Sequence, residues 1–216
     1  MKIKTQEISH PLLKEKEVRL FIKRIDKIHP FVSGNKWFKL KYNLLEAKKQ
    51  GLNTLLTFGG AYSNHISATA FAAQEKGINS IGIIRGEEHL PLNPTLRFAI
   101  DNGMKLHYIS RSNYKQKTSA YFLEALKNQF GDFYLIPEGG TNELAIQGAN
   151  EILDKNDIQD YICCPVGTGG TIAGIINASN DQQTVIGFPA IKGFEQLEKD
   201  INNWTNTTNC IFINDY

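Results

Sequence analysis

Ser33-Gly34-Asn35-Lys36-Trp37-Phe38-Lys39-Leu40 encodes a turn that leads directly into a helix. The turn places Lys36 at the start of an amphipathic run, where unpaired backbone N–H groups and the positive end of the helix dipole disfavour an ammonium. This position predicts that the pKa of Lys36 is lowered from about 10.4. A lowered pKa favours the neutral amine, which is the form that reacts with an aldehyde cofactor. For Lys36 taken alone, a solvated surface lysine is the simpler interpretation. Two glycine-rich turns downstream favour the cofactor-binding interpretation of Lys36 over the surface one.

Composition and charge exclude several classes of protein. The 216 residues allow one large domain or two small ones, and 41% of them are hydrophobic. The net charge of +2 comes from 24 basic and 22 acidic residues without a basic block, so no nucleic-acid partner is indicated. No apolar run approaches the roughly 20 residues that span a bilayer. We therefore expect no membrane partner, and the N-terminus lacks the apolar core of a signal peptide.

The cysteines and histidines form no metal-binding or disulfide pattern. Cys163, Cys164 and Cys210 are an odd number, and two of them are adjacent in an apolar run. We interpret them as reduced thiols in buried strands of a cytoplasmic protein. The histidines outside the first glycine turn lie apart without ligand spacing, so no metal site is expected.

Strand-type runs alternate with helical segments along almost the whole chain. The predicted strands cover 18–24, 54–58, 80–84, 105–109, 133–136, 161–166, 184–188 and 210–213. The predicted helices cover 36–50, 63–76, 94–102, 114–130, 142–153, 171–178 and 193–201. Alternation with short connections predicts an α/β fold of open, mostly parallel sheets covered by helices on both faces. Ligands bind beyond the carboxyl ends of such strands, where the glycine turns fall.

The first glycine turn is Phe58-Gly59-Gly60-Ala61-Tyr62-Ser63-Asn64-His65, between a strand and a helix. It places Ser63, Asn64 and His65 at a helix N-terminus, where backbone N–H groups favour a carboxylate or phenolate. A plain alternative is a helix cap at Ser63, a turn residue at Asn64 and a solvated His65.

The second glycine turn, Gly167-Thr168-Gly169-Gly170-Thr171, follows the predicted strand 161–166 and opens a helix. Its free N–H groups and two hydroxyls suit a phosphate. It is no P-loop, because no Gly-Lys-Ser/Thr follows, and Ile172 breaks the dinucleotide fingerprint. The turn therefore fits a phosphate monoester better than a pyrophosphate. A tight turn without a ligand remains an alternative, as it does for a third turn at Glu138–Asn142.

In this order, the turns resemble the pyridoxal-phosphate enzymes of the tryptophan synthase β-like fold. The similarity is greatest to the 1-aminocyclopropane-1-carboxylate deaminase and D-cysteine desulfhydrase family. The motifs that carry it are Ser33–Lys36, Gly59–His65, Glu138–Asn142 and Gly167–Thr171. The resemblance implies two α/β domains: a large pyridoxal-phosphate-binding one from residues 1–39 and 148–216, and a small inserted one from 40–147. It also implies a homodimer.

The resemblance also implies roles for individual residues. Lys36 would hold pyridoxal 5'-phosphate as an internal aldimine and later act as a base, and Asn64 would hydrogen-bond the phenolic oxygen. Ser63 is expected in catalysis, and Ser63, Asn64 and His65 in binding a small amino-acid substrate. The phosphate would be cradled by Gly167, Thr168, Gly169, Gly170 and Thr171.

Three functions remain open at this point. The first is a deaminase or lyase that releases ammonia, and sulfide from D-cysteine-like substrates, favoured over cyclopropane ring opening because Ser63-Asn64-His65 is similar to the desulfhydrases. The second is a non-catalytic protein that binds the cofactor or an amino acid. This is an alternative because family members continue well beyond Tyr216, into a part expected to contact the pyridine nitrogen and the substrate. The third, a nicotinamide-dependent dehydrogenase, is disfavoured by the broken fingerprint.

Overall fold

The structure is a computed structural model that describes residues 3–190, 193–206 and 209–214. Its strands are β1 (Thr5–Ile8), β2 (Leu20–Lys23), β3 (Thr54–Gly59), β4 (Asn79–Arg85), β5 (Met104–Ile109), β6 (Tyr134–Ile136), β7 (Tyr161–Val166), β8 (Thr184–Pro189) and β9 (Cys210–Phe212). Its α-helices are α1 (Pro11–Glu15), α2 (Asn35–Lys49), α3 (Asn64–Glu75), α4 (Pro94–Asp101), α5 (Arg111–Tyr114), α6 (Ala120–Phe130), α7 (Glu143–Ala149), α8 (Gly170–Ala178) and α9 (Glu195–Trp204). Short 3-10 helices are η1 (Ile25–Lys27), η2 (Glu138–Gly140) and η3 (Asn150–Ile152).

A four-stranded parallel sheet, in the order β5-β4-β3-β6, forms the first half of the fold. Its strands alternate their side chains between two covered faces. Leu55 packs with Leu40, Ala68 and Ala72 from α2 and α3. The neighbouring Leu56 instead packs with Tyr114 and Leu126 from α5 and α6. The predicted open α/β sheet with helices on both faces is therefore confirmed here.

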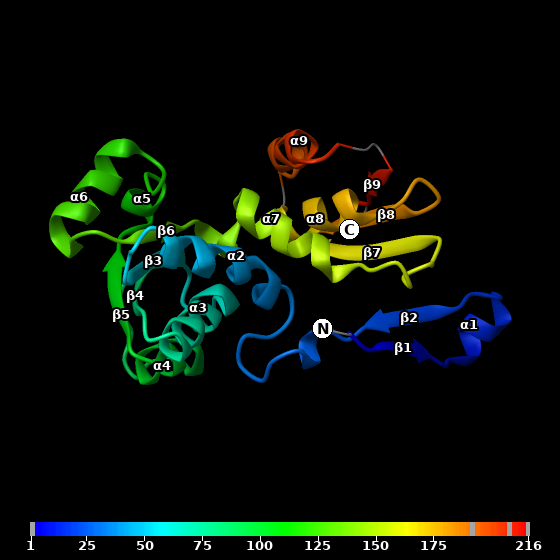
Figure 1. Cartoon of the computed structure of the whole chain (residues 1–216), viewed down its shortest axis with the longest axis horizontal. Coiled ribbons are helices and arrows are strands. Elements are labelled where there is room, and N and C mark those ends of the chain that lie inside the picture. The colour runs from blue at the N-terminus through cyan, green and yellow to red at the C-terminus, as the bar shows by residue number, and fades with distance from the viewer. Residues whose placement is uncertain (1–2, 191–192, 207–208, 215–216) are drawn as a thin grey trace.

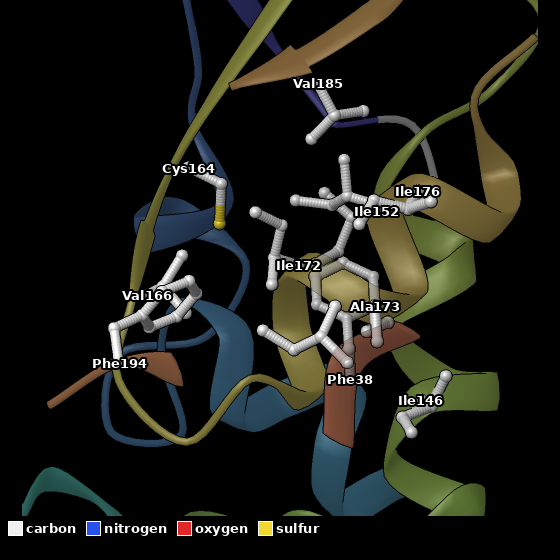
Figure 2. Close-up of a cluster of buried hydrophobic side chains, with 13 residues drawn as sticks. Phe38, Ile146, Ile152, Cys164, Val166, Ile172, Ala173, Ile176, Val185 and Phe194 are labelled. Carbon is white, nitrogen blue, oxygen red and sulfur yellow. The ribbon is translucent and has the colours of Figure 1, made fainter. Parts of the chain in front are cut away.

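A three-stranded parallel sheet, β7-β8-β9, forms the second half. One face packs on a core to which α2, α7, α8 and the segment before α9 contribute, including Phe38, Ile146, Ile172 and Phe194 (Figure 2). The other face is open in the described part of the chain, because Tyr161, Cys163 and Pro165 alternate with buried positions on β7 and are exposed. Among the described residues, helices cover only the first of the two faces of this sheet.

The same alternation corrects the expected burial of the cysteines. Cys164 points into the core of Figure 2 and is buried. Cys163 is the next residue along the strand, so its side chain lies on the open face and is exposed. All three thiols are free, with Cys210 partly buried on β9.

The beginning of the chain forms an antiparallel hairpin of β1 and β2 around α1, which lies at the end of the molecule away from the four-stranded sheet (Figure 1). Only its second strand was expected from the sequence. His10 caps α1 through Nδ1, which accepts from the Leu12 N–H at 3.2 Å, and Pro11 takes the first helical position.

Helices α2 and α7 lie between the two sheets (Figure 1). They pack so closely that a Cβ added to Gly148 on α7 would lie 2.0 Å from the Phe38 carbonyl oxygen on α2. Helix α7 also packs on α8, and a Cβ added to Gly174 would lie 2.4 Å from the Ala149 Cβ. The backbone carrying Lys36 is thus held directly against the segment that joins the sheets.

One predicted helix is wrong in extent. The segment 114–130 was expected to be continuous, but α5 ends at Tyr114 and α6 begins at Ala120. The break is explained by Ser119, whose hydroxyl accepts from the Phe122 N–H at 3.3 Å and caps α6.

Candidate active site

Lys36 lies in the first turn of α2, directly after a turn at Gly34 with φ of +64°. That left-handed conformation suits glycine. The Lys36 amine is partly buried and donates to the Gly139 carbonyl oxygen at 3.2 Å. Burial lowers the pKa of Lys36 to about 8. The predicted direction of the shift agrees with this value, and burial of the amine is its physical cause.

The turn that contacts Lys36 is itself fixed to α2 by a buried amide network. Asn142 caps α7, accepting from the Ala145 N–H at 2.9 Å. Its side-chain amide donates to Asn43 Oδ1 at 2.7 Å, and Tyr134 also donates to that oxygen at 3.1 Å. Asn43 is fully buried and in turn donates to the Lys39 carbonyl oxygen at 2.8 Å. Helix α2 and the 138–142 turn therefore form one polar unit.

The Gly167–Thr171 turn meets the same helix. The Asn35 side-chain amide donates to Thr171 Oγ1 at 2.8 Å, and the Thr168 and Thr141 hydroxyls lie 2.6 Å apart. Helix α8 begins at Gly170, and its N-cap, Gly169, has φ of +79° and provides no side-chain cap. The Gly170 N–H donates to the Thr168 carbonyl oxygen at 3.0 Å, and the N–H groups that follow it in the first turn have no side-chain cap. Such uncapped N–H groups are the condition for anion binding at a helix N-terminus.

Lys39 is a component of the site that the sequence analysis missed. Its side chain is 1% exposed, and its amine donates to Thr141 Oγ1 at 2.7 Å and to Thr168 Oγ1 at 3.4 Å. Burial, and to a smaller extent the charge of Lys36, lower the pKa of Lys39 well below its usual value. The sequence signal that could have found Lys39 is its spacing from Lys36, because residues three apart on a helix lie on the same face.

Ser63, Asn64 and His65 lie at the N-terminus of α3. The Ser63 hydroxyl accepts from the Ile66 N–H at 3.3 Å and so caps the helix, while Asn64 is exposed. This arrangement includes the cap that the plain alternative predicted. It does not test the proposed contacts of these residues with cofactor or substrate, which stay predictions.

His65 is buried rather than solvated, and its protonation follows from its neighbours. The Thr57 hydroxyl donates to the Ile136 carbonyl at 2.8 Å, so His65 Nε2, 2.7 Å from that hydroxyl, must be the donor. Burial first, then the charges of Lys36 and Lys39, lower the pKa of His65 well below its usual value. The imidazole is therefore neutral. It packs on the Gly140 backbone, where an added Cβ would lie 3.0 Å from His65 Cε1.

The site thus gathers Lys36, Lys39, two threonine hydroxyls and an open helix N-terminus, and none of the carboxylates in the described residues pairs with either amine. Such a set fits a phosphorylated aldehyde, because the phosphate supplies the missing negative charge and the aldehyde reacts with a neutral amine. The described residues contain no cluster of His, Cys, Asp and Glu able to hold a metal. In the same residues, no helix combines the length and apolar character that crossing a membrane requires.

Comparison with known proteins decides the family. Residues 3–201 match the family described as pyridoxal-phosphate dependent enzymes. The chain belongs to that family. A mitochondrial bifunctional D-cysteine desulfhydrase/1-aminocyclopropane-1-carboxylate deaminase of Arabidopsis thaliana is 36% identical over 175 residues, covering 72% of this chain and 44% of the relative. A D-cysteine desulfhydrase of Serratia proteamaculans is 28% identical over 170 residues, covering 72% of this chain and 51% of the relative.

A solved structure supports the same assignment. The crystal structure of an ACC deaminase homologue superimposes with a TM-score of 0.81 at 26% identity, covering 94% of this chain and 65% of that one. The tryptophan synthase β-like fold and the family's cofactor, pyridoxal phosphate, are confirmed by these matches. The chain spans about half the length of the curated relatives that it matches.

Proposed function

We propose that this pyridoxal-phosphate family member is a deaminase or carbon–sulfur lyase that releases ammonia from a small amino acid, with sulfide from D-cysteine-like substrates. The observation that carries the proposal is the position of the Lys36 amine. The amine donates a hydrogen bond to the Gly139 carbonyl oxygen. Lys36 also lies one turn of α2 before Lys39, whose amine contacts the Thr141 and Thr168 hydroxyls. A reactive amine beside a phosphate-binding turn with a second amine is the arrangement that this cofactor needs.

The residues that would hold the cofactor come from three elements. Thr168, Thr171 and the N–H groups of Gly167–Gly170 would bind the phosphate, with Lys39 neutralising part of its charge. Lys36 would bind the aldehyde carbon, and the exposed Asn64 amide would hydrogen-bond the phenolic oxygen. When bound, pyridoxal phosphate supplies an electron-withdrawing ring that stabilises negative charge at the substrate α-carbon.

The chain's own groups would orient the substrate and transfer the proton. The backbone N–H groups at the start of α3, with Ser63, would orient the substrate carboxylate. Lys36 Nζ would take up and return the proton at the α-carbon, a role suited to an amine with a pKa of about 8. For D-cysteine, cleavage of the carbon–sulfur bond and addition of water would give pyruvate, ammonia and sulfide.

The finer parts of the proposal concern organisation and location. We propose two domains, a large one from residues 1–39 and 148–216 and a small inserted one from 40–147. The four-stranded sheet within 54–136 and the separate three-stranded sheet within 161–212 support this division. We also propose a homodimer and a cytoplasmic location.

Two alternative functions remain. One alternative is a 1-aminocyclopropane-1-carboxylate deaminase proper, which the double name of the Arabidopsis relative supports. The other alternative is a non-catalytic protein that binds the cofactor or an amino acid.

The test is to add pyridoxal phosphate, reduce with borohydride and locate the modified lysine by mass spectrometry. We expect the label on Lys36, and its loss in Lys36→Ala but not in Lys127→Ala, an exposed lysine on α6. Label confined to other lysines contradicts the proposal. Keto-acid and sulfide release from D-cysteine, and 2-oxobutanoate release from the cyclopropane substrate, then separate the two enzymes from the binding protein.

A further inference from the structure

Asn93 connects the first glycine turn to helix α4. Its side-chain Nδ2 donates to the Ala61 carbonyl oxygen at 3.0 Å, across 32 positions of the sequence. The same side chain caps α4, because its Oδ1 accepts from the Leu96 N–H at 3.0 Å. A backbone N–H can donate only to the amide oxygen, so the cap leaves the amide nitrogen facing Ala61. The two hydrogen bonds therefore hold Asn93 in one orientation and give it two separate structural roles.

The turn that Asn93 contacts leads directly into α3. The Ser63 N–H donates to the Gly60 carbonyl oxygen at 3.1 Å, which closes a four-residue turn, the 60–63 turn. Ala61 is the second residue of this turn, and Ser63 is both its last residue and the N-cap of α3. The position of the Ala61 peptide therefore determines where the Ser63 hydroxyl and the first N–H groups of α3 point.

The residues around the 60–63 turn are closely packed. A Cβ added to Gly59 would lie 2.5 Å from Ile66 Cγ1 and 2.9 Å from Ser63 Oγ, so the start of α3 lies against the end of β3. Ala61 also packs on the hydrophobic core that α3 and α4 share, which includes Ile66, Ala70, Leu96 and Ala99. The turn is thus held by packing and by the hydrogen bond from Asn93.

We propose that Asn93 is a positioning residue for substrate binding. Its hydrogen bond to the Ala61 carbonyl holds the 60–63 turn so that the Ser63 hydroxyl and the first N–H groups of α3 point at the substrate carboxylate. This inference rests on the proposed function, which assigns the carboxylate to that end of α3. Because hydrogen bonds weaken steeply away from their preferred distance and angle, a small shift of the turn weakens all of these contacts together. Asn93 acts through the turn and is assigned no contact with the substrate.

Three variants separate this positioning role from simple capping. Asn93→Asp keeps an oxygen for the Leu96 N–H, and aspartate caps a helix as well as asparagine does, but it has no N–H for the Ala61 carbonyl. Asn93→Ala loses both hydrogen bonds. Ser119→Ala is the matched control, because it removes the cap of α6, which packs on the other face of the sheet from α3. A residue that only caps a helix would affect unfolding and not binding.

Binding is measured as protection of Lys36 from borohydride labelling. Pyridoxal phosphate is added and its excess removed, D-alanine is titrated, and the label fixed on Lys36 is quantified by mass spectrometry. D-Alanine carries the amine and the single carboxylate of the proposed substrates without a leaving sulfur, and its amine displaces the Lys36 amine from the cofactor. We expect the D-alanine concentration for half protection to rise roughly tenfold in Asn93→Asp and Asn93→Ala, and to stay unchanged in Ser119→Ala. The urea midpoint should fall in Asn93→Ala and Ser119→Ala but not in Asn93→Asp.

The results that contradict the inference are distinct from failure of the proposed function. Equal half-protection concentrations in the parent chain and in Asn93→Asp reject the role of Asn93 alone. A rise in Ser119→Ala as large as that in Asn93→Asp also rejects it, because lost stability then explains the weaker binding. Labelled Lys36 that D-alanine does not protect in the parent chain rejects the carboxylate site at α3, and the inference with it. No label on Lys36 in the parent chain rejects the proposed function itself, on which the inference rests.

Discussion

At the scale of single residues, the chemistry depends on two amines on one face of α2. Among the described residues, the Lys36 amine hydrogen-bonds to one backbone carbonyl and the Lys39 amine to two threonine hydroxyls. Removing an ammonium from water without a compensating negative charge disfavours its charged form. The same burial that lowers both pKa values therefore prepares the site for an aldehyde and an anion.

Lys36 should react as a free amine at a lower pH than an ordinary lysine. Its pKa of about 8 means that the unreactive ammonium prevails below pH 8 and the nucleophilic amine above it. We expect reductive methylation by formaldehyde to rise with a midpoint near pH 8 at Lys36, measured peptide by peptide by mass spectrometry. Exposed Lys127 serves as the reference. Identical pH profiles for both lysines would contradict the lowered pKa.

Lys39 should show a conflict between stability and binding. Replacing a buried amine that has no acid partner by the isosteric, apolar Met removes its desolvation cost, so Lys39→Met should raise the free energy of unfolding by about 1 kcal/mol. The same change should weaken pyridoxal phosphate binding roughly tenfold, because one charged phosphate ligand is lost. Urea unfolding and cofactor titration measure the two effects, with Lys127→Met as the control. A destabilised variant with unchanged cofactor affinity would refute both expectations.

At the scale of elements, the sequence predicted most strands and helices because their signals are local. Asn93 caps α4 and Ser63 caps α3, and each stands directly before an apolar run, which is a local signal for a helix start. The break between α5 and α6 was missed because Ser119 lies within a run that is helical in periodicity on both sides. The exposure of Cys163 was also missed, since it depends on which sheet face is covered rather than on the strand itself.

The candidate site shows the same division between local and long-range information. Glycine turns and Lys36 are visible in the sequence, whereas the hydrogen bonds of Lys39 to Thr141 and Thr168 join residues 102 and 129 positions apart. His65 was expected at the substrate, yet its hydrogen bond to Thr57 could be recognised only once β3, β6 and α3 were in contact.

Thr57 ties those three elements together and should be intolerant of losing its hydroxyl. Thr57→Val keeps the shape but removes the hydroxyl's hydrogen bond to the Ile136 carbonyl and the acceptor of His65 Nε2 in a buried environment. We expect a loss of about 2 kcal/mol or more in the free energy of unfolding, measured in urea. Thr57→Ser retains both hydrogen bonds and should cost less, about 1 kcal/mol for the lost methyl. Equal losses in the two variants would show that packing, not hydrogen bonding, explains this position.

At the scale of the whole molecule, the two sheets are joined through the contact of α2 with α7 and of α7 with α8. Gly148 and Gly174 supply the small surfaces that permit both approaches. The cofactor-facing residues come from both sides of this contact, with Lys36 and Lys39 on α2 and Thr168 and Thr171 before and in α8. The geometry of the site consequently depends on how closely these helices pack.

Gly148→Ala tests that dependence. We expect it to lower the free energy of unfolding, whereas a glycine-to-alanine change in a helix usually raises it. In a helix interior this substitution normally stabilises by about 1 kcal/mol. Here the new Cβ would lie 2.0 Å from the Phe38 carbonyl oxygen, so α2 or α7 must move. We expect a loss of about 1–3 kcal/mol in urea unfolding and a lower yield of cofactor attached to Lys36. Gln147→Ala, at the exposed neighbouring position of α7, should change neither quantity. If Gly148→Ala were as stable as the parent chain and still attached the cofactor fully, close packing of α2 on α7 could not be what positions Lys36.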